Sequence, residues 1–146
     1  MNSITLMRGL GYAGLLPFGF FAAGVWVFDD FLQSLCYQGF VIYSLVILSF
    51  LAGSLWGSAI GVTGVAKLQR LLVSNGIAVF AAMAVLTAQL LVAAVLLMLG
   101  HLAVLWYERN TGDVDNWYGR LRTQLTLLAT AMHVVYVAGT IASNGA

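Results

Sequence analysis

The chain has 146 residues, of which 62% are apolar and 8% charged, and its net charge is +1. Soluble domains carry about 25% charged residues, so this composition excludes an ordinary soluble protein, and the near-neutral charge argues against nucleic acid as a partner. Stretches without a charged side chain cover residues 9–28, 31–66, 71–107 and 123–146. Each is long enough to cross a hydrocarbon core, which takes roughly 20 helical residues. We therefore expect one all-α integral membrane domain, residues 1–146, with the lipid bilayer as its surroundings.

The first predicted span covers residues 9–28, between Arg8 and the pair Asp29-Asp30. A basic start followed by an apolar run is also typical of a signal peptide. The run is longer than a usual signal core, and residues 22–24 (AAG) form a poor cleavage site, so we expect a retained helix. Pro17 lies in the middle of this span and predicts a kink.

The second span is predicted over residues 39–60, after a more polar start, and a basic loop at 67–70 follows it. The next uncharged stretch, residues 71–107, would form a helix of about 55 Å at 1.5 Å per residue, too long for one crossing. It should fold into a hairpin that turns at Thr87-Ala88-Gln89, with spans at 71–86 and 89–107.

The fifth span is predicted over residues 123–142, after a polar loop at 108–120. Five crossings place every basic residue on one side of the membrane, and Asp29 and Asp30 on the other. The basic residues are Arg8, Lys67, Arg70, Arg109, Arg120 and Arg122. The positive-inside rule then predicts a five-helix bundle with its N-terminus in and its C-terminus out. Because no Arg- and Ser-rich transit peptide precedes the first span, we expect a bacterial inner membrane rather than a mitochondrial one.

Small residues follow one face of the second span. Ser49, Gly53, Gly57 and Gly61 are spaced four apart, and Trp56 lies beside them. Such a face lets another helix backbone approach closely. Packing against the first or fifth span of the same chain is the favoured interpretation, and an interface for a partner protein or a second copy is the alternative.

The two histidines, His101 and His133, both lie inside predicted spans, where ionisable side chains are functional candidates. They can meet if the fourth and fifth spans pack together. The favoured interpretation is a neutral histidine that hydrogen-bonds a neighbouring helix. Axial ligands of a haem and a proton relay are the alternatives, but the chain has no second histidine pair and no haem attachment motif.

The sequence gives little support for a disulfide, a metal site or a catalytic site. Cys36 is the one cysteine, which excludes an internal disulfide, and a closed zinc site lacks ligands. The sequence contains no paired-carboxylate site, nucleophile elbow or phosphate-binding glycine loop. We therefore expect no enzyme activity, no metal and no cofactor.

Several segments of the chain resemble a known family. The matching segments are LGYAGLLPF at 10–18, YS at 43–44, LSFLAGSLWG at 48–57, NWY at 116–118, LR at 121–122 and LTLLAT at 125–130. In this order they are similar to the transmembrane protein 69-like proteins, also grouped as domain of unknown function 3429, which occur in inner membranes of proteobacteria and in mitochondria. The resemblance implies the same membrane fold but no activity. One departure is Leu55, where relatives often have His or Arg before the tryptophan.

Two functions remain open from the sequence. The first is a non-catalytic accessory subunit or assembly factor of a larger inner-membrane complex, such as a respiratory one, because the chain is small, carries a glycine-lined face and lacks catalytic groups. The second is a small transporter or a lipid- or quinone-binding protein with a site among spans two, four and five, near Trp56, His101 and His133.

Residues Asn116, Trp117, Tyr118 and Arg122 are expected to anchor the inner interface. Arg122 would bind a lipid phosphate or pair with a carboxylate. Its candidate partners are Glu108, Asp113 and Asp115.

Overall fold

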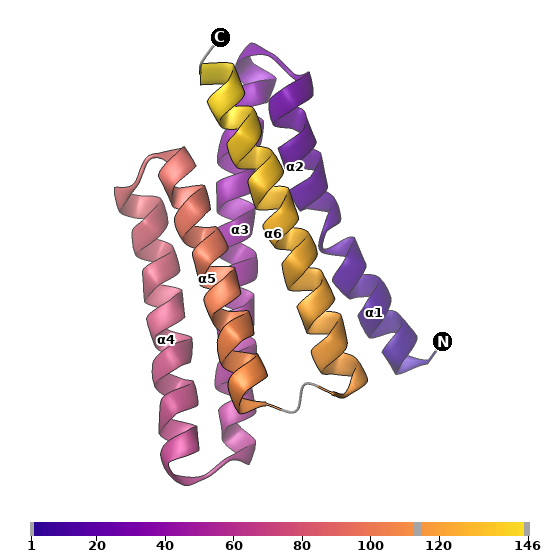
Figure 1. Cartoon of the computed structure of the whole chain (residues 1–146), viewed down its shortest axis with the longest axis vertical. Coiled ribbons are helices and arrows are strands. Elements are labelled where there is room, and N and C mark those ends of the chain that lie inside the picture. Colours follow the sequence, from indigo (N-terminus) through magenta and orange to yellow (C-terminus); the bar gives the residue numbers. More distant parts are fainter. Residues whose placement is uncertain (1, 113–114, 145–146) are drawn as a thin grey trace.

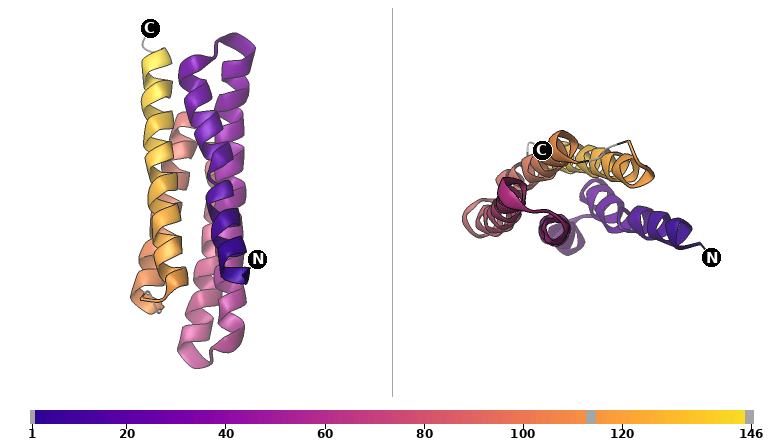
Figure 2. Two further views of the ribbon diagram at one scale, coloured as in Figure 1. Left: turned by 90° about the vertical axis from the view of Figure 1, so that its right-hand side faces the viewer. Right: turned by 90° about the horizontal axis from the view of Figure 1, so that it is seen from below.

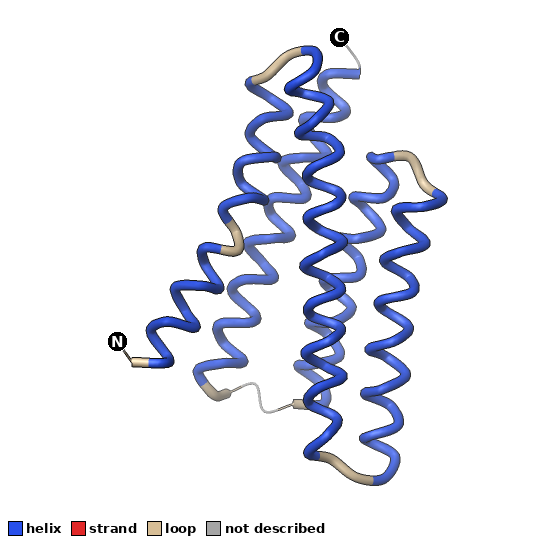
Figure 3. The backbone as a smooth tube through the Cα atoms, turned by 180° about the vertical axis from the view of Figure 1, so that it is seen from behind, coloured by secondary structure: helices blue, strands red, loops and turns tan. Residues whose placement is uncertain are grey.

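The computed structural model describes residues 2–112 and 115–144, and this part of the chain is mostly helical (Figure 1, Figure 3). The elements are α1 (Ser3–Ala13), α2 (Leu16–Val27), α3 (Asp30–Ser58), the 3₁₀ turn η1 (Ala59–Gly61), α4 (Gly64–Thr87), α5 (Leu90–Thr111) and α6 (Trp117–Asn144).

Five helical segments among the described residues are long and apolar enough to cross a membrane. They are Ser3–Val27, Asp30–Gly61, Gly64–Thr87, Leu90–Thr111 and Trp117–Asn144. The prediction of five apolar helices in an all-α fold is therefore confirmed, and the long third stretch turns between Thr87 and Leu90.

The helices extend further than the predicted spans. The predicted basic loop at 67–70 is wrong, because these residues belong to the first turns of α4. Helix α3 begins nine residues before the predicted start, at Asp30, and its polar Gln33 side chain donates to the carbonyl oxygen of Val25 at 2.9 Å. Hydrophobicity marks the part of a helix that suits lipid, whereas the helical hydrogen bonds continue past that part.

The first segment is broken where the proline predicts a kink. Helix α1 ends at Ala13, and Pro17 lies in the first turn of α2. A proline has no N–H, and its ring prevents a regular helix in the preceding turn. The hydroxyl of Tyr43 on α3 donates to the Gly14 carbonyl at 2.7 Å, so the break is compensated by a neighbouring helix.

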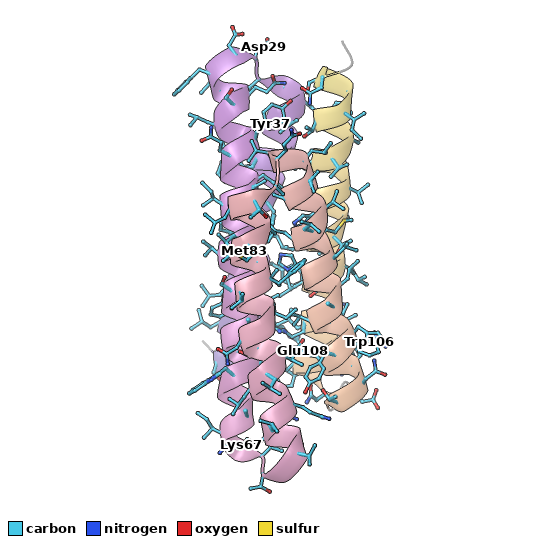
Figure 4. The ribbon with its side chains drawn as sticks, turned by 90° about the vertical axis from the view of Figure 1, so that its left-hand side faces the viewer. Asp29, Tyr37, Lys67, Met83, Trp106 and Glu108 are labelled. Carbon is cyan, nitrogen blue, oxygen red and sulfur yellow. The ribbon has the colours of Figure 1, made fainter. Side chains whose placement is uncertain are left out.

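Alternating helix directions bring the N-terminus, the α3–α4 connection and the α5–α6 connection to one end of the bundle, with the C-terminus at the other (Figure 1). Asp29 and Lys67 lie at opposite ends (Figure 4). Seen along the bundle, α3 lies between α4 and the α1–α2 segment, and α5 and α6 form a second row along one side of these helices (Figure 2). The basic residues, which all flank the N-terminal end and these two connections, therefore gather at one end.

Close packing between the helices relies on two other glycines, which lie outside the small-residue face formed by Ser49, Gly53, Gly57 and Gly61. A Cβ atom at Gly100 on α5 would lie 2.6 Å from Leu48 Cδ2 on α3. One at Gly139 on α6 would lie 2.6 Å from Trp26 Nε1 on α2. Glycine at these positions lets the helices approach closely.

The small-residue face of α3 points away from the bundle. Ser49 is exposed, and a Cβ atom at Gly53, Gly57 or Gly61 would meet nothing within 4 Å. Trp56 beside them is 49% exposed. The favoured interpretation, that this face packs against the protein's own first or fifth span, is therefore wrong.

Candidate functional site

Three buried polar side chains meet in the middle of the bundle. Ser44 comes from α3, His101 from α5 and His133 from α6, and none is more than 1% exposed. The Ser44 hydroxyl lies 2.7 Å from His133 Nε2 and 3.2 Å from His101 Nε2. The Nδ1 atom of His133 lies 2.7 Å from the Ala129 carbonyl oxygen, one helical turn earlier. We call these three side chains the histidine network.

The contacts of the histidine network fix where the protons lie when both rings are neutral. A carbonyl oxygen only accepts, so His133 Nδ1 carries the proton and His133 Nε2 is a bare acceptor. Ser44 must then donate to His133 Nε2. Its oxygen is left to accept, so His101 Nε2 carries a proton and donates to it. By elimination, His101 Nδ1 is an acceptor without a proton.

Aromatic rings enclose the network on its apolar sides. Phe40 packs edge-on to His133 with ring centroids 4.8 Å apart, and stacks on Tyr136 at 4.2 Å. Phe18 lies edge-on to His101 at 6.1 Å. Because each ring is fully buried, the histidines are held in one position by packing as well as by hydrogen bonds.

An apolar cavity of about 340 Å³ lies beside the network, between α1, the start of α2, α3 and α6. This volume falls within the range of small-molecule sites, about 300–1,000 Å³. Its walls are mostly aliphatic and aromatic. They include Leu10 and Gly11 from α1, Phe18 from α2, Phe50 and Leu51 from α3, and Leu125 and Thr126 from α6.

The wall of the apolar cavity contains a few polar side chains, of which Thr126 is one. His101 lines one part of it, and Tyr118 and Arg122 line another. Among the described residues every fully enclosed side-chain nitrogen and oxygen has a hydrogen-bond partner. His101 bonds through Nε2, and no described residue bonds its Nδ1. His101 is almost fully buried, and the small part of its side chain that is not enclosed lines this cavity.

A second, polar cavity of about 280 Å³ lies at the basic end of the bundle and shares Tyr118 and Arg122 with the first. Arg122 forms a bidentate ion pair with Glu108, in which Nη2 contacts Oε1 and Nε lies 3.3 Å from Oε2. Of the partners that the sequence leaves open for Arg122, the structure has Glu108. Asp113 lies outside the described residues. Leu55, the departure from the family pattern, is buried and lines this polar cavity.

The remaining predicted anchor residues have local contacts. Asn116 accepts from the backbone N–H of Gly119 at 2.7 Å, near the start of α6. The guanidinium of Arg8 lies 5.8 Å from the centre of the Trp117 ring. Tyr118 is 40% exposed, and the Arg122 guanidinium lies 6.0 Å from its ring. The Arg8 contact ties the start of α6 to α1, and the Arg122–Glu108 ion pair ties it to α5.

The structure brings His101 and His133 together but leaves Trp56 outside the site. The ring centroids of the histidines are 5.3 Å apart. They suit a haem poorly, because both Nε2 atoms contact the same Ser44 hydroxyl rather than opposite sides of an open gap. Trp56 lines neither of these two cavities. The apolar cavity lies among the first, second and fifth segments, with His101 reaching it from the fourth.

Ser44 belongs to the YS segment at 43–44 that resembles the family, but the sequence assigns it no role in a site. Serines are common in apolar helices, and no local spacing identifies one that joins two distant histidines. Cys36 is buried in contact with Gly24. No group of three His, Cys, Asp or Glu side chains among the described residues is arranged to hold a metal ion.

A comparison with family models matches residues 4–138 to the family described as "Protein of unknown function (DUF3429)". The match covers most of the chain, so the protein belongs to this family, as the resemblance of its segments predicts. Comparisons with curated proteins and with solved structures gave no match. The relation to the transmembrane protein 69-like proteins stays a prediction.

Proposed function

We propose that this chain is a multi-pass protein of the bacterial inner membrane, with its N-terminus in the cytoplasm and its C-terminus outside. Five apolar helices and the gathering of the basic residues at one end of the bundle support this proposal. Cytoplasmic loops of such proteins carry an excess of Lys and Arg.

Within that membrane, we propose that the protein binds one amphiphilic molecule of the lipid or quinone class in the apolar cavity. The observation that carries this proposal is an apolar cavity of ligand size, with Arg122 in its wall and also His101, whose Nδ1 bonds no described residue. In a soluble protein such a cavity would simply favour apolar ligands.

In a bilayer the polar groups decide which molecule is held. Lipid tails are as apolar as the cavity wall, so moving an apolar tail from the bilayer into the cavity has little hydrophobic driving force. Selective binding must therefore come from shape and from hydrogen bonds to His101 and to the Tyr118–Arg122 region. A molecule with an apolar body and a polar end meets both requirements.

Ligand-dependent thermal stabilisation of the purified protein tests this function. The probes are a decyl-substituted benzoquinone, its hydroquinone and a phosphatidylglycerol with oleoyl chains. A ligand at 100 times its Kd stabilises the folded state by about 2.7 kcal/mol, a Tm increase of several degrees for a chain of this size.

The variant Leu51→Trp fills the apolar cavity and should abolish the stabilisation. Val46→Trp is the matched control, because Val46 lies on the same helix but is 54% exposed. If none of the three probes raises the Tm, or if Leu51→Trp responds like the control, the proposed function is wrong.

A second candidate is the accessory subunit or assembly factor of a larger inner-membrane complex, such as a respiratory one. It is favoured by the outward position of Gly53, Gly57 and Gly61, which the protein's own helices do not use. Gly57→Leu would then disrupt assembly without lowering the stability of the isolated chain. Unchanged co-purification of a partner with this variant would count against the glycine face as the interface.

A further inference from the structure

We propose that the ligand of the apolar cavity presents a hydroxyl group to His101, and that it is a hydroquinone rather than the corresponding quinone. This inference rests on the proposed function, since it assigns the chemistry of the ligand's polar end. It follows from the direction of the hydrogen bonds in the histidine network.

The network leaves one free position, and that position accepts. Ala129 fixes the proton on His133 Nδ1, Ser44 donates to His133 Nε2, and His101 Nε2 donates to Ser44. His101 lines the cavity, and its bare Nδ1 is the acceptor left for a ligand there, so it matches an O–H donor.

A quinone carbonyl would place a second acceptor against this nitrogen. To donate to it, His101 would have to carry its proton on Nδ1, leaving its Nε2 bare against the Ser44 oxygen. The Ser44 proton is committed to His133, so two buried acceptors would face each other without a hydrogen between them. Buried acceptors without a donor are costly, and discrimination by such a mismatch exceeds that from shape alone.

The walls near His101 favour an aromatic ring over an aliphatic alcohol. Phe18 lies edge-on to His101 and lines the apolar cavity, and Phe50 is a second aromatic residue of the cavity wall. Aromatic rings pack edge-to-face with other rings, and such pairs add to the free energy of burial. A hydroquinone offers both the ring and the hydroxyl, and its tail fits the aliphatic remainder of the cavity.

Binding of decyl-hydroquinone and of decyl-benzoquinone to the full-length protein in detergent, measured without oxygen, tests the inference. We expect the hydroquinone to bind about tenfold more tightly, the discrimination given by roughly one hydrogen bond. Ser44 does not line the cavity, so it acts on the ligand only by orienting the protons of His101. Ser44→Ala frees His101 to carry its proton on either nitrogen, and the ratio of the two Kd values should fall toward one.

His133→Phe is a second variant with the same expected result, because it removes the acceptor that holds the Ser44 proton. Ser49→Ala, an exposed serine on the same helix, should keep the wild-type ratio.

The outcomes separate the inference from the proposed function. Binding of neither form, with phosphatidylglycerol also inactive, would overturn the proposed function itself. Equal binding of the two forms, tighter binding of the quinone, or an unchanged ratio in both folded variants would overturn the hydroquinone inference alone. A decyl alcohol that binds as tightly as the hydroquinone would overturn the assignment of an aromatic ligand.

Discussion

At the scale of single residues, Ser44 has the widest consequences, because one hydroxyl satisfies a ring nitrogen on each of two other helices. Its side chain is fully buried, as are those of His101 and His133. Buried polar groups in a low-dielectric interior stabilise and orient one another only while each has a partner. The network thus specifies how α3, α5 and α6 face each other.

Ser44→Ala should therefore destabilise the protein. The substitution leaves His133 Nε2 without its donor, and a buried unsatisfied group costs about 1–3 kcal/mol. The free energy of unfolding, measured by titration with a denaturing detergent in mixed micelles, checks this. Ser49→Ala changes an exposed serine of the same helix and should have no measurable effect. Equal stability of the two variants would show that the network does not hold the helices together.

The sequence identifies the histidines of this site but not its serine. An ionisable residue within an apolar span is conspicuous because burying its charge is costly, so His101 and His133 stand out without a structure. Ser44 has no such signature, and its partners lie 57 and 89 residues away in the chain. Which nitrogen is free depends on tertiary contacts that no local pattern encodes.

At the scale of helices, the glycines divide into those that the bundle uses and those that it does not. Gly100 and Gly139 lie where a neighbouring side chain occupies the space of a Cβ atom, whereas Gly53 and Gly57 face outward. Four-residue spacing predicts a smooth face but not the direction in which it points. The glycines that pack inside are isolated in the sequence, so their role could not be predicted from spacing.

Gly139→Ala and Gly53→Ala should separate these two classes. The new Cβ at position 139 would lie 2.6 Å from Trp26 Nε1, an atom that also donates to the Val135 carbonyl at 3.1 Å. Overpacking of this kind costs about 1–3 kcal/mol. Gly53→Ala meets open space and removes a poor helix former, so it should be neutral or slightly stabilising. Thermal unfolding in detergent measures both variants, and a loss of stability at position 53 would contradict the outward face.

The break between α1 and α2 gives another prediction at this scale. Tyr43→Phe removes the donor to the Gly14 carbonyl and should cost about 1 kcal/mol of unfolding free energy. In a Pro17→Ala background a regular helix can form through this turn, so the carbonyl regains a backbone donor and the cost of Tyr43→Phe should shrink. A double-mutant cycle of detergent unfolding measures the coupling. Additive effects would mean that the hydroxyl does not compensate the proline.

At the scale of the whole molecule, charge and length together predict the architecture. The length of residues 71–107 and the positions of the basic residues both require a hairpin there, and the structure turns between Thr87 and Leu90. The exact helix ends were less predictable, because charged residues such as Lys67 lie inside a helical turn rather than in a loop. The apolar cavity could not be predicted, since it depends on how α1 sits against α3 and α6.

The proposed orientation is testable with reporter fusions. Alkaline phosphatase, which is active only outside the cytoplasm, should be active when fused after Asn144. A fluorescent protein that folds only in the cytoplasm should be bright when fused after Thr111, at the basic end of the bundle. The reverse pattern would contradict the topology that the charges predict.

The most direct test of amphiphile binding is native mass spectrometry of the protein purified in mild detergent from its own membrane. We predict one chain that carries a single small molecule, and an organic extract should identify this molecule as a hydroquinone-class amphiphile. The Leu51→Trp variant should lose the molecule, whereas the Val46→Trp variant should retain it. A bare chain, or one found in a stoichiometric protein complex whose cavity holds no small molecule, would contradict the account, and the complex would favour the accessory role.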